Sequence, residues 1–144
     1  RDLNNIEFDY IDSLKEHSKR IQAGKLLLID ERERLNEIRK ILIEKYEDHL
    51  NILYSKPIFL EIFGKNTSKG AAVLKIAQMY GIKPEEIMAI GDGENDISMI
   101  KSAGLGIAVG NASESIKKEA DFVTLSNNEN GVAYAINKFV FSES

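Results

Sequence analysis

The sequence contains no cysteine. A disulfide framework is therefore excluded, and the composition fits a reducing compartment, so we expect a cytoplasmic protein. No apolar run approaches the length of about 20 residues that a membrane-spanning helix needs, and no signal-peptide pattern opens the chain. Internal repeats and low-complexity tracts are also absent. These absences argue against a disulfide-rich secreted domain and give no reason to expect a membrane partner.

An excess of positive charge is lacking too. The 144 residues include 19 Lys and Arg against 23 Asp and Glu, which gives a net charge of −4. General nucleic-acid binders usually carry a basic patch, so we expect no nucleic-acid partner. The length allows one domain or two small ones. The chain starts at Arg1 with neither a methionine nor an initial strand, which predicts a fragment of a larger polypeptide.

The most informative stretch is Ile87–Asp96, with the sequence IMAIGDGEND. Its first four residues are apolar and predict a short strand buried on both faces. The two glycines allow a tight turn, and a helix is predicted over Glu94–Ala103. Asp92 would then follow the strand directly, and Asp96 would lie in the first turn of the helix. Ligands of open parallel sheets bind at this edge, and two carboxylates held there suit Mg²⁺.

The same stretch also has purely structural interpretations. Gly-Asp-Gly is a common turn, and Asp or Asn near a helix start is an ordinary cap. A nucleotide-binding α/β domain is a further alternative and the least favoured. The third Gly or Ala of the dinucleotide pattern is replaced by Asp96, whose charge would oppose a pyrophosphate.

The chain changes character at residues 64–68, which are small, polar or flexible, and we place a domain boundary near this point. Thr67 or Ser68 can cap the following helix. After this point helices and strands alternate, which predicts a parallel sheet with crossover helices. The predicted elements besides those above are a helix over Lys69–Tyr80, a strand over Gly106–Val109, a helix over Ser113–Ala120 that starts at Asn111 and Glu114, a strand over Asp121–Leu125 and a last helix marked by Val132 and Phe139.

The residues before this boundary follow a different order. We expect a helix over Tyr10–Ile21, a strand over Lys25–Asp30 and a helix over Arg32–Tyr46. Asp30 and Glu33 have the spacing of a capping box at the start of the second helix. His49–Phe63 contains two apolar stretches around Ser-Lys-Pro, which predict two antiparallel strands joined by a turn.

The string Gly-Asp-Gly-Glu-Asn-Asp resembles the fourth motif of the haloacid dehalogenase-like (HAD) phosphatases, in particular the Cof-type subfamily. Ser68-Lys69-Gly70 opens a helix as the third motif of that family does, and residues 103–112 resemble the strand and loop after motif four. The resemblance implies an α/β fold with a HAD-like Rossmannoid parallel sheet. Residues 64–144 would be the C-terminal half of the core domain, and residues 1–63 part of an α/β cap domain.

The resemblance also implies a function and roles for four residues. The activity would be Mg²⁺-dependent hydrolysis of small phosphorylated metabolites, such as sugar phosphates, through an aspartyl-phosphate intermediate. Asp92 would bind the Mg²⁺ ion directly. Asp96 would support the metal through a water or orient Lys69, and Lys69 would neutralise the phosphate. Asn95 would donate its amide to the substrate phosphate. The structural alternatives are a surface lysine at a helix start and ordinary caps.

The family's nucleophile, the first Asp of an Asp-x-Asp motif, has no counterpart in this sequence. Asp30 ends a predicted strand, but Arg32 stands where the second aspartate would be, and Asp9 and Asp12 are three positions apart. Covalent catalysis needs its nucleophile, so we expect this chain to be inactive alone. The strand that would carry the nucleophile is missing, so we expect the chain to pair with a missing N-terminal segment or to self-associate. The alternative is a non-catalytic HAD-like binding or assembly module.

Overall fold

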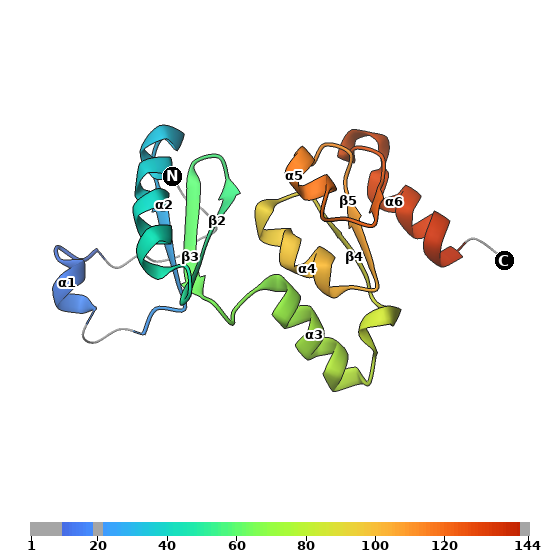
Figure 1. Cartoon of the computed structure of the whole chain (residues 1–144), viewed down its shortest axis with the longest axis horizontal. Helices are drawn as coiled ribbons and strands as arrows, with labels where there is room; N and C mark the ends of the chain where they lie inside the picture. The colour runs from blue at the N-terminus through green and yellow to red at the C-terminus, as the bar shows by residue number, and fades with distance from the viewer. Residues whose placement is uncertain (1–9, 19–21, 142–144) are drawn as a thin grey trace.

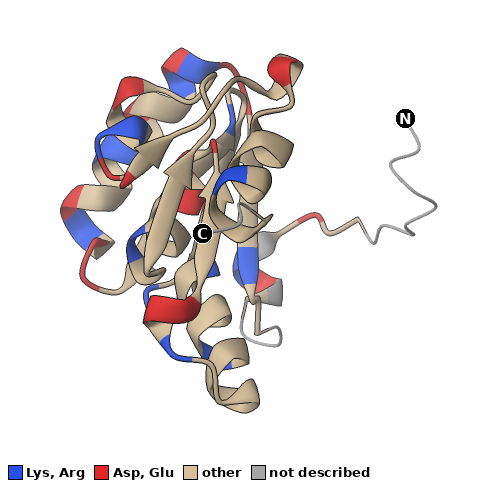
Figure 2. Cartoon of the chain, turned by 90° about the vertical axis from the view of Figure 1, so that its right-hand side faces the viewer, with Lys and Arg blue, Asp and Glu red and all other residues tan. Residues whose placement is uncertain are grey.

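The computed structural model describes residues 10–18 and 22–141, and its elements form two small sheets connected through residues 65–68 (Figure 1). We call residues 22–64 the N-terminal unit and residues 65–141 the C-terminal unit. Among the described residues, no helix is both long and apolar enough to cross a membrane. Acidic and basic residues are interspersed along the ribbon, as Figure 2 shows.

The N-terminal unit is an antiparallel sheet with one helix against it (Figure 1). Its elements are β1 (Lys25–Ile29), α2 (Arg32–Tyr46), β2 (Leu50–Lys56) and β3 (Phe59–Gly64). The strand order is β1-β3-β2, so β2 lies at an edge of the sheet. Strand alternation sends one set of apolar side chains toward α2. The buried members of this core are Leu35, Ile52, Tyr54, Leu60 and Ile62.

The C-terminal unit is a parallel sheet of order β4-β5-β6 with helical crossovers. Its strands are β4 (Met88–Gly91), β5 (Leu105–Ala108) and β6 (Phe122–Val123). Its helices are α3 (Lys69–Tyr80), η1 (Pro84–Glu86), η2 (Glu94–Asp96), α4 (Ile97–Ser102), α5 (Glu114–Lys117), η3 (Asn127–Glu129), α6 (Gly131–Ile136) and the π-helix η4 (Asn137–Phe141). The predicted alternation of helices and strands is confirmed, and β4 is an edge strand of the described sheet.

Several local predictions are confirmed. Helix α2 has the predicted bounds, and the two strands predicted in His49–Phe63 form the antiparallel pair β2 and β3. Ser68 is the cap of α3, because its hydroxyl accepts a hydrogen bond from the Ala71 amide at 3.1 Å. The chain leaves α3 at Gly81, whose φ of 70° is a left-handed conformation that suits glycine.

Other local predictions are wrong. The helix predicted over Tyr10–Ile21 is reduced to α1 (Leu14–His17), and residues 19–21 lie outside the described part of the chain. The capping box of Asp30 and Glu33 does not form, because the N-cap of α2 is Glu31 and no side chain caps it. Asp30 instead pairs with Arg34 at 3.3 Å.

Two further predictions about the C-terminal unit also fail. The cap of α5 is Ser113 and not Asn111. Strand β4 is not buried on both faces, because Met88 and Ile90 are only half-buried while Ala89 and Gly91 are buried. An edge strand has only one neighbour, so the described residues cover it incompletely.

Candidate active site

The loop after β4 folds around the carboxylate of Asp96. This side chain is buried, and its Oδ2 accepts hydrogen bonds from the backbone amides of Asp92 at 3.1 Å and Gly93 at 3.0 Å. Gly91 permits this arrangement, because a Cβ there would lie 2.5 Å from the Cβ of Asp96. Asp96 thus fixes the shape of the Gly-Asp-Gly turn from inside.

The other oxygen of Asp96, Oδ1, accepts a hydrogen bond from Nζ of Lys69, the first residue of α3. Helix α3 can pack closely against α4 because Gly70 has no side chain. A Cβ there would lie 2.2 Å from the backbone oxygen of Ser98 in α4. Lys69 remains about half exposed, with 49% of its side chain accessible.

Burial alone would raise the pKa of Asp96. The Lys69 ammonium and the amides of Gly93 and Asp92 act in the opposite direction, and together they hold the pKa below its ordinary value. Asp96 is therefore ionised at neutral pH, and its carboxylate accepts hydrogen bonds from Lys69 and from two backbone amides. Both oxygens of Asp96 thus have donors among the described residues, Oδ1 from Lys69 and Oδ2 from the two amides.

Asp92 has different surroundings, because it is exposed. Its Oδ2 accepts a hydrogen bond from Nδ2 of Asn111 at 3.3 Å. Asn111 follows β5, the neighbour of β4, and its Oδ1 accepts from the amide of Asn127 at 2.9 Å. The side-chain amide of Asn111 is thus held by the first residue of η3 and donates to Asp92.

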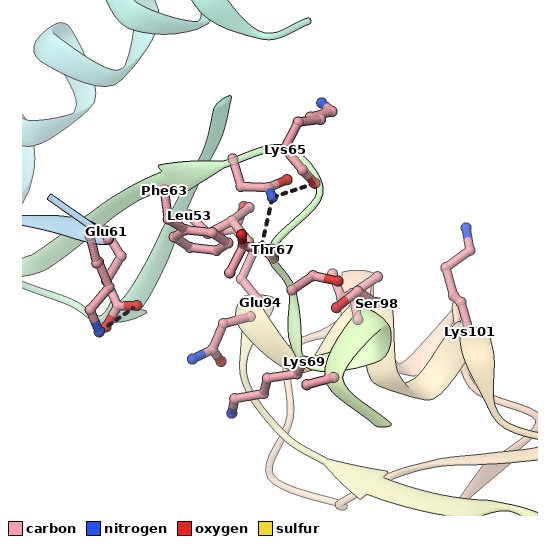
Figure 3. Close-up of a pocket in the computed structure, with 16 residues that line it drawn as sticks. Leu53, Glu61, Phe63, Lys65, Thr67, Lys69, Glu94, Ser98 and Lys101 are labelled. Carbon is pink, nitrogen blue, oxygen red and sulfur yellow. Dashed lines mark hydrogen bonds and ion pairs between the residues drawn. The ribbon is translucent and has the colours of Figure 1, made fainter. Parts of the chain in front are cut away.

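Asn95, the fourth predicted residue, lines a cleft of about 900 Å³ together with Lys69. The far wall of this cleft is the face of the N-terminal sheet opposite α2, and it supplies Leu53, Glu61 and Phe63. Glu61 pairs with Lys25 at 3.2 Å, so this wall combines apolar surface with one ion pair (Figure 3). Lys101 also borders the cleft but points away from Lys69 in Figure 3.

The structure therefore brings the four predicted residues to one edge of the parallel sheet. Lys69 and Asp96 are in contact, and Asp92 and Asn95 lie in the same loop as Asp96. Two residues there were not predicted. Asn111 contacts Asp92 because it follows β5, which is the neighbour of β4 in the sheet. Glu94 contacts the N-terminal unit, and nothing in its local sequence indicates this.

The donor set suits Mg²⁺ only in part. Mg²⁺ commonly keeps several waters and takes one or two carboxylates together with substrate phosphate oxygens. Asp92 offers an exposed carboxylate of this kind. No group of three or more His, Asp or Glu side chains that could hold a metal occurs among the described residues. Residues from outside this set would have to complete the site.

A lysine and carboxylates thus lie beyond the strand ends of a parallel sheet, at the edge where open α/β sheets generally bind ligands. A model of the haloacid dehalogenase-like hydrolase family matches residues 2–136. The chain belongs to this family.

One relative is the 5-amino-6-(5-phospho-D-ribitylamino)uracil phosphatase YcsE of Bacillus subtilis. It is 41% identical over 107 residues, which are 73% of this chain and 43% of the relative. The chain spans about half the length of the curated relatives it matches, for example 50% and 49% of two others.

Solved structures agree with this assignment. A haloacid dehalogenase-like hydrolase from B. subtilis matches with a TM-score of 0.76 and 37% identity, over 92% of this chain and 47% of its own. A HAD subclass IIB sugar phosphatase matches with a TM-score of 0.75 and 30% identity, over 86% and 46%. The predicted fold class, α/β with a HAD-like parallel sheet, is confirmed.

Proposed function

We propose that this chain forms part of a Mg²⁺-dependent phosphatase that hydrolyses small phosphorylated metabolites through an aspartyl-phosphate intermediate. The observation that supports this most directly is the pairing of Lys69 with buried Asp96 beside exposed Asp92. Phosphoryl transfer depends mainly on positioning and on charge stabilisation, and these residues supply both signs of charge at one sheet edge.

Each residue has a role that its surroundings support. Asp96 holds Lys69 by its ammonium, and the remaining donor hydrogens of that ammonium would bind a phosphate. Asn111 orients Asp92, whose exposed carboxylate would bind the metal ion. Asn95 would donate its amide to the phosphate. A bound Mg²⁺ would neutralise charge on the transferring group.

The nucleophile has to come from outside residues 1–144, which contain no Asp-x-Asp. We therefore propose that this chain alone is inactive and that it pairs with an N-terminal segment or self-associates. The edge position of β4 supports this, because an open apolar edge favours further strand pairing. On this proposal residues 64–144 are half of a core domain, of the Cof type, and residues 1–63 part of its cap.

The proposed substrates are sugar phosphates or compounds like them. Two relatives carry names of this kind, one a sugar phosphatase and the other a phosphatase of a phosphoribityl compound. The cleft wall of this chain, with Phe63 and Leu53 beside the Lys25–Glu61 pair, offers both apolar and polar contacts to a leaving group. The cytoplasmic location and the absence of a nucleic-acid partner remain predictions from composition.

The test starts from the complete reading frame that contains these residues, expressed as one protein. Phosphate release from a panel of sugar phosphates is measured with Mg²⁺ and with EDTA. We expect Mg²⁺-dependent turnover, and about a hundredfold loss or more of kcat in Lys69→Ala and Asp92→Ala. Lys75→Ala, an exposed lysine of the same helix, is the matched control.

Two results would contradict the proposal. One is phosphatase activity of the isolated 144-residue chain, which would show that no outside nucleophile is needed. The other is a complete reading frame without an Asp-x-Asp strand and without turnover. The second result would favour a non-catalytic HAD-like binding or assembly module.

A further inference from the structure

Glu94 connects the loop after β4 to the N-terminal unit. Its Oε1 accepts a hydrogen bond from Nη2 of Arg39 in α2, and its Oε2 accepts from the backbone amide of Tyr54 in β2 at 3.2 Å. Both side chains of the ion pair are partly buried, with 26% of Arg39 and 30% of Glu94 exposed. Each carboxylate oxygen thus has its own donor, and both donors belong to the other unit.

The two donors are held in place by the N-terminal unit itself. Strand β2 is an edge strand, so its outward amides lack a strand partner, and the amide of Tyr54 meets Glu94 instead. Nε of Arg39 donates to the carbonyl of Ile52 in the same strand at 3.1 Å. The guanidinium is therefore bound to this edge by a contact that does not involve Glu94.

The ring of Tyr54 is fixed by contacts with α2. Its hydroxyl donates to Oδ1 of Asn36 at 2.8 Å, and the guanidinium carbon of Arg32 lies 3.3 Å from the ring centroid. Tyr54 is only 5% exposed. The edge of β2 with Arg39 thus has contacts within its own unit that hold the two donors where Glu94 meets them.

On the other side, Glu94 belongs to a loop that is equally constrained. The residue before it, Gly93, donates its amide to Asp96, and the residue after it, Asn95, lines the cleft. Any displacement of Glu94 therefore moves the loop that carries Asp92, Asn95 and Asp96. Holding Glu94 fixes this loop relative to the cleft wall.

We propose that Glu94 is a positioning residue that holds the N-terminal unit closed over the loop after β4. The closed state is held by a carboxylate shared between a guanidinium and an edge amide, and release of Glu94 lets the cleft open. This inference concerns the geometry of the chain, so it stands or falls independently of any phosphatase activity. An ion pair at a surface contributes little by itself, but a second charge-assisted hydrogen bond to the same carboxylate adds to it.

The test is a distance measurement between the two units in the full chain. The sequence has no cysteine, so spin labels at Glu44→Cys in α2 and Lys75→Cys in α3 attach only where intended. Both positions are exposed. Pulsed electron paramagnetic resonance then gives the distribution of label distances, and circular dichroism verifies that each variant is folded.

With Glu94 present we expect one narrow population of distances. Glu94→Ala should raise the ratio of open to closed molecules about fivefold, which corresponds to losing about 1 kcal/mol of contact. Glu94→Gln keeps an acceptor for the Tyr54 amide and should have a smaller effect. Arg39→Gln removes the partner of Glu94 and should also open the cleft. The double variant, Arg39→Gln with Glu94→Ala, should open it no further than Glu94→Ala alone.

Glu114→Gln is the matched control, because this carboxylate is 80% exposed and pairs with Lys117 within its own helix. It should leave the distances unchanged. An unchanged distribution in Glu94→Ala, an equal shift in the control, additive effects in the double variant, or a broad distribution before any substitution would each overturn the proposal.

Discussion

Lys69 and Asp96 lie 27 positions apart in the sequence and form the ion pair around which the candidate site is arranged. The carboxylate is buried, whereas about half of the lysine side chain is accessible. The pair is therefore asymmetric. Asp96 binds backbone amides inside the loop, whereas Lys69 is one of the residues that line the cleft.

Lys69→Met is expected to lower the free energy of unfolding by about 1 kcal/mol, because buried Asp96 loses its cationic partner but keeps two backbone donors. Lys101→Met is the control. Its partner, Glu119, is exposed, so the change should stay within about 0.5 kcal/mol. Urea unfolding at equal protein concentration measures the free energy of unfolding of both variants. Equal losses in the two variants would contradict the asymmetry.

The lowered pKa of Asp96 makes a prediction about acid stability. A folded-state pKa below the ordinary value of 3.8 means that ionised Asp96 stabilises the fold above that pH. This contribution is lost as the pH falls below 3.8 toward the pKa in the folded state. The difference in unfolding free energy between the parent chain and Asp96→Asn should thus be constant near neutral pH and shrink in acid. Urea titrations between pH 3 and pH 7 measure it, and a difference independent of pH would contradict the shift.

The sequence was sufficient to predict features that depend on local pattern. The apolar periodicity of Arg32–Tyr46 predicted α2 with its bounds, and the alternation after residue 66 predicted the parallel sheet. Asp92 was expected at a strand end and Asp96 beside it because a short strand, two glycines and a helix leave few arrangements. Lys69 came from a resemblance, and its contact with Asp96 could not be read from spacing.

Contacts between distant segments could not be predicted in this way. Nothing near Glu94 in sequence indicates Arg39, because their contact depends on how the two units meet. Asn111 was interpreted as a helix cap, which is its commonest local use. Its position after β5 places it beside Asp92 instead, because parallel strands end at the same edge. Whether Asn111 caps a helix or contacts Asp92 depends on the tertiary fold, which local sequence does not reveal.

Gly70 should be intolerant of a side chain, because α3 and α4 are in contact at this point. Alanine there would bring Cβ to 2.2 Å from the Ser98 oxygen, and the helices would have to separate. We expect Gly70→Ala to cost about 1–3 kcal/mol of stability, as overpacked positions do. Gly24→Ala, where no atom lies within 4 Å, should be close to neutral. Thermal unfolding measures the stability of both variants. An unchanged stability of Gly70→Ala would contradict the close packing of α3 on α4.

Asp92 should be the carboxylate on which metal binding depends. Asp96 has described donors on both of its oxygens, whereas exposed Asp92 accepts one described hydrogen bond, from Asn111 at 3.3 Å. Because Mn²⁺ favours the same oxygen ligands as Mg²⁺ and is paramagnetic, its binding can be followed by the signal of the free ion. Asp92→Asn should weaken Mn²⁺ binding about tenfold or more, and Asn111→Ala should weaken it less, since it only orients the ligand.

The matched control for this metal titration is Asp48→Asn, which removes an exposed carboxylate from the N-terminal unit and keeps the same net charge as Asp92→Asn. If metal binding depended only on overall charge, both variants would weaken it equally, and the assignment to Asp92 would fail. Competition by added Mg²⁺ in the parent chain, absent in Asp92→Asn, would show that the two ions share one site. The titration uses the complete reading frame, because residues outside this chain would have to complete the metal site. Its readout is binding, so the result does not depend on turnover.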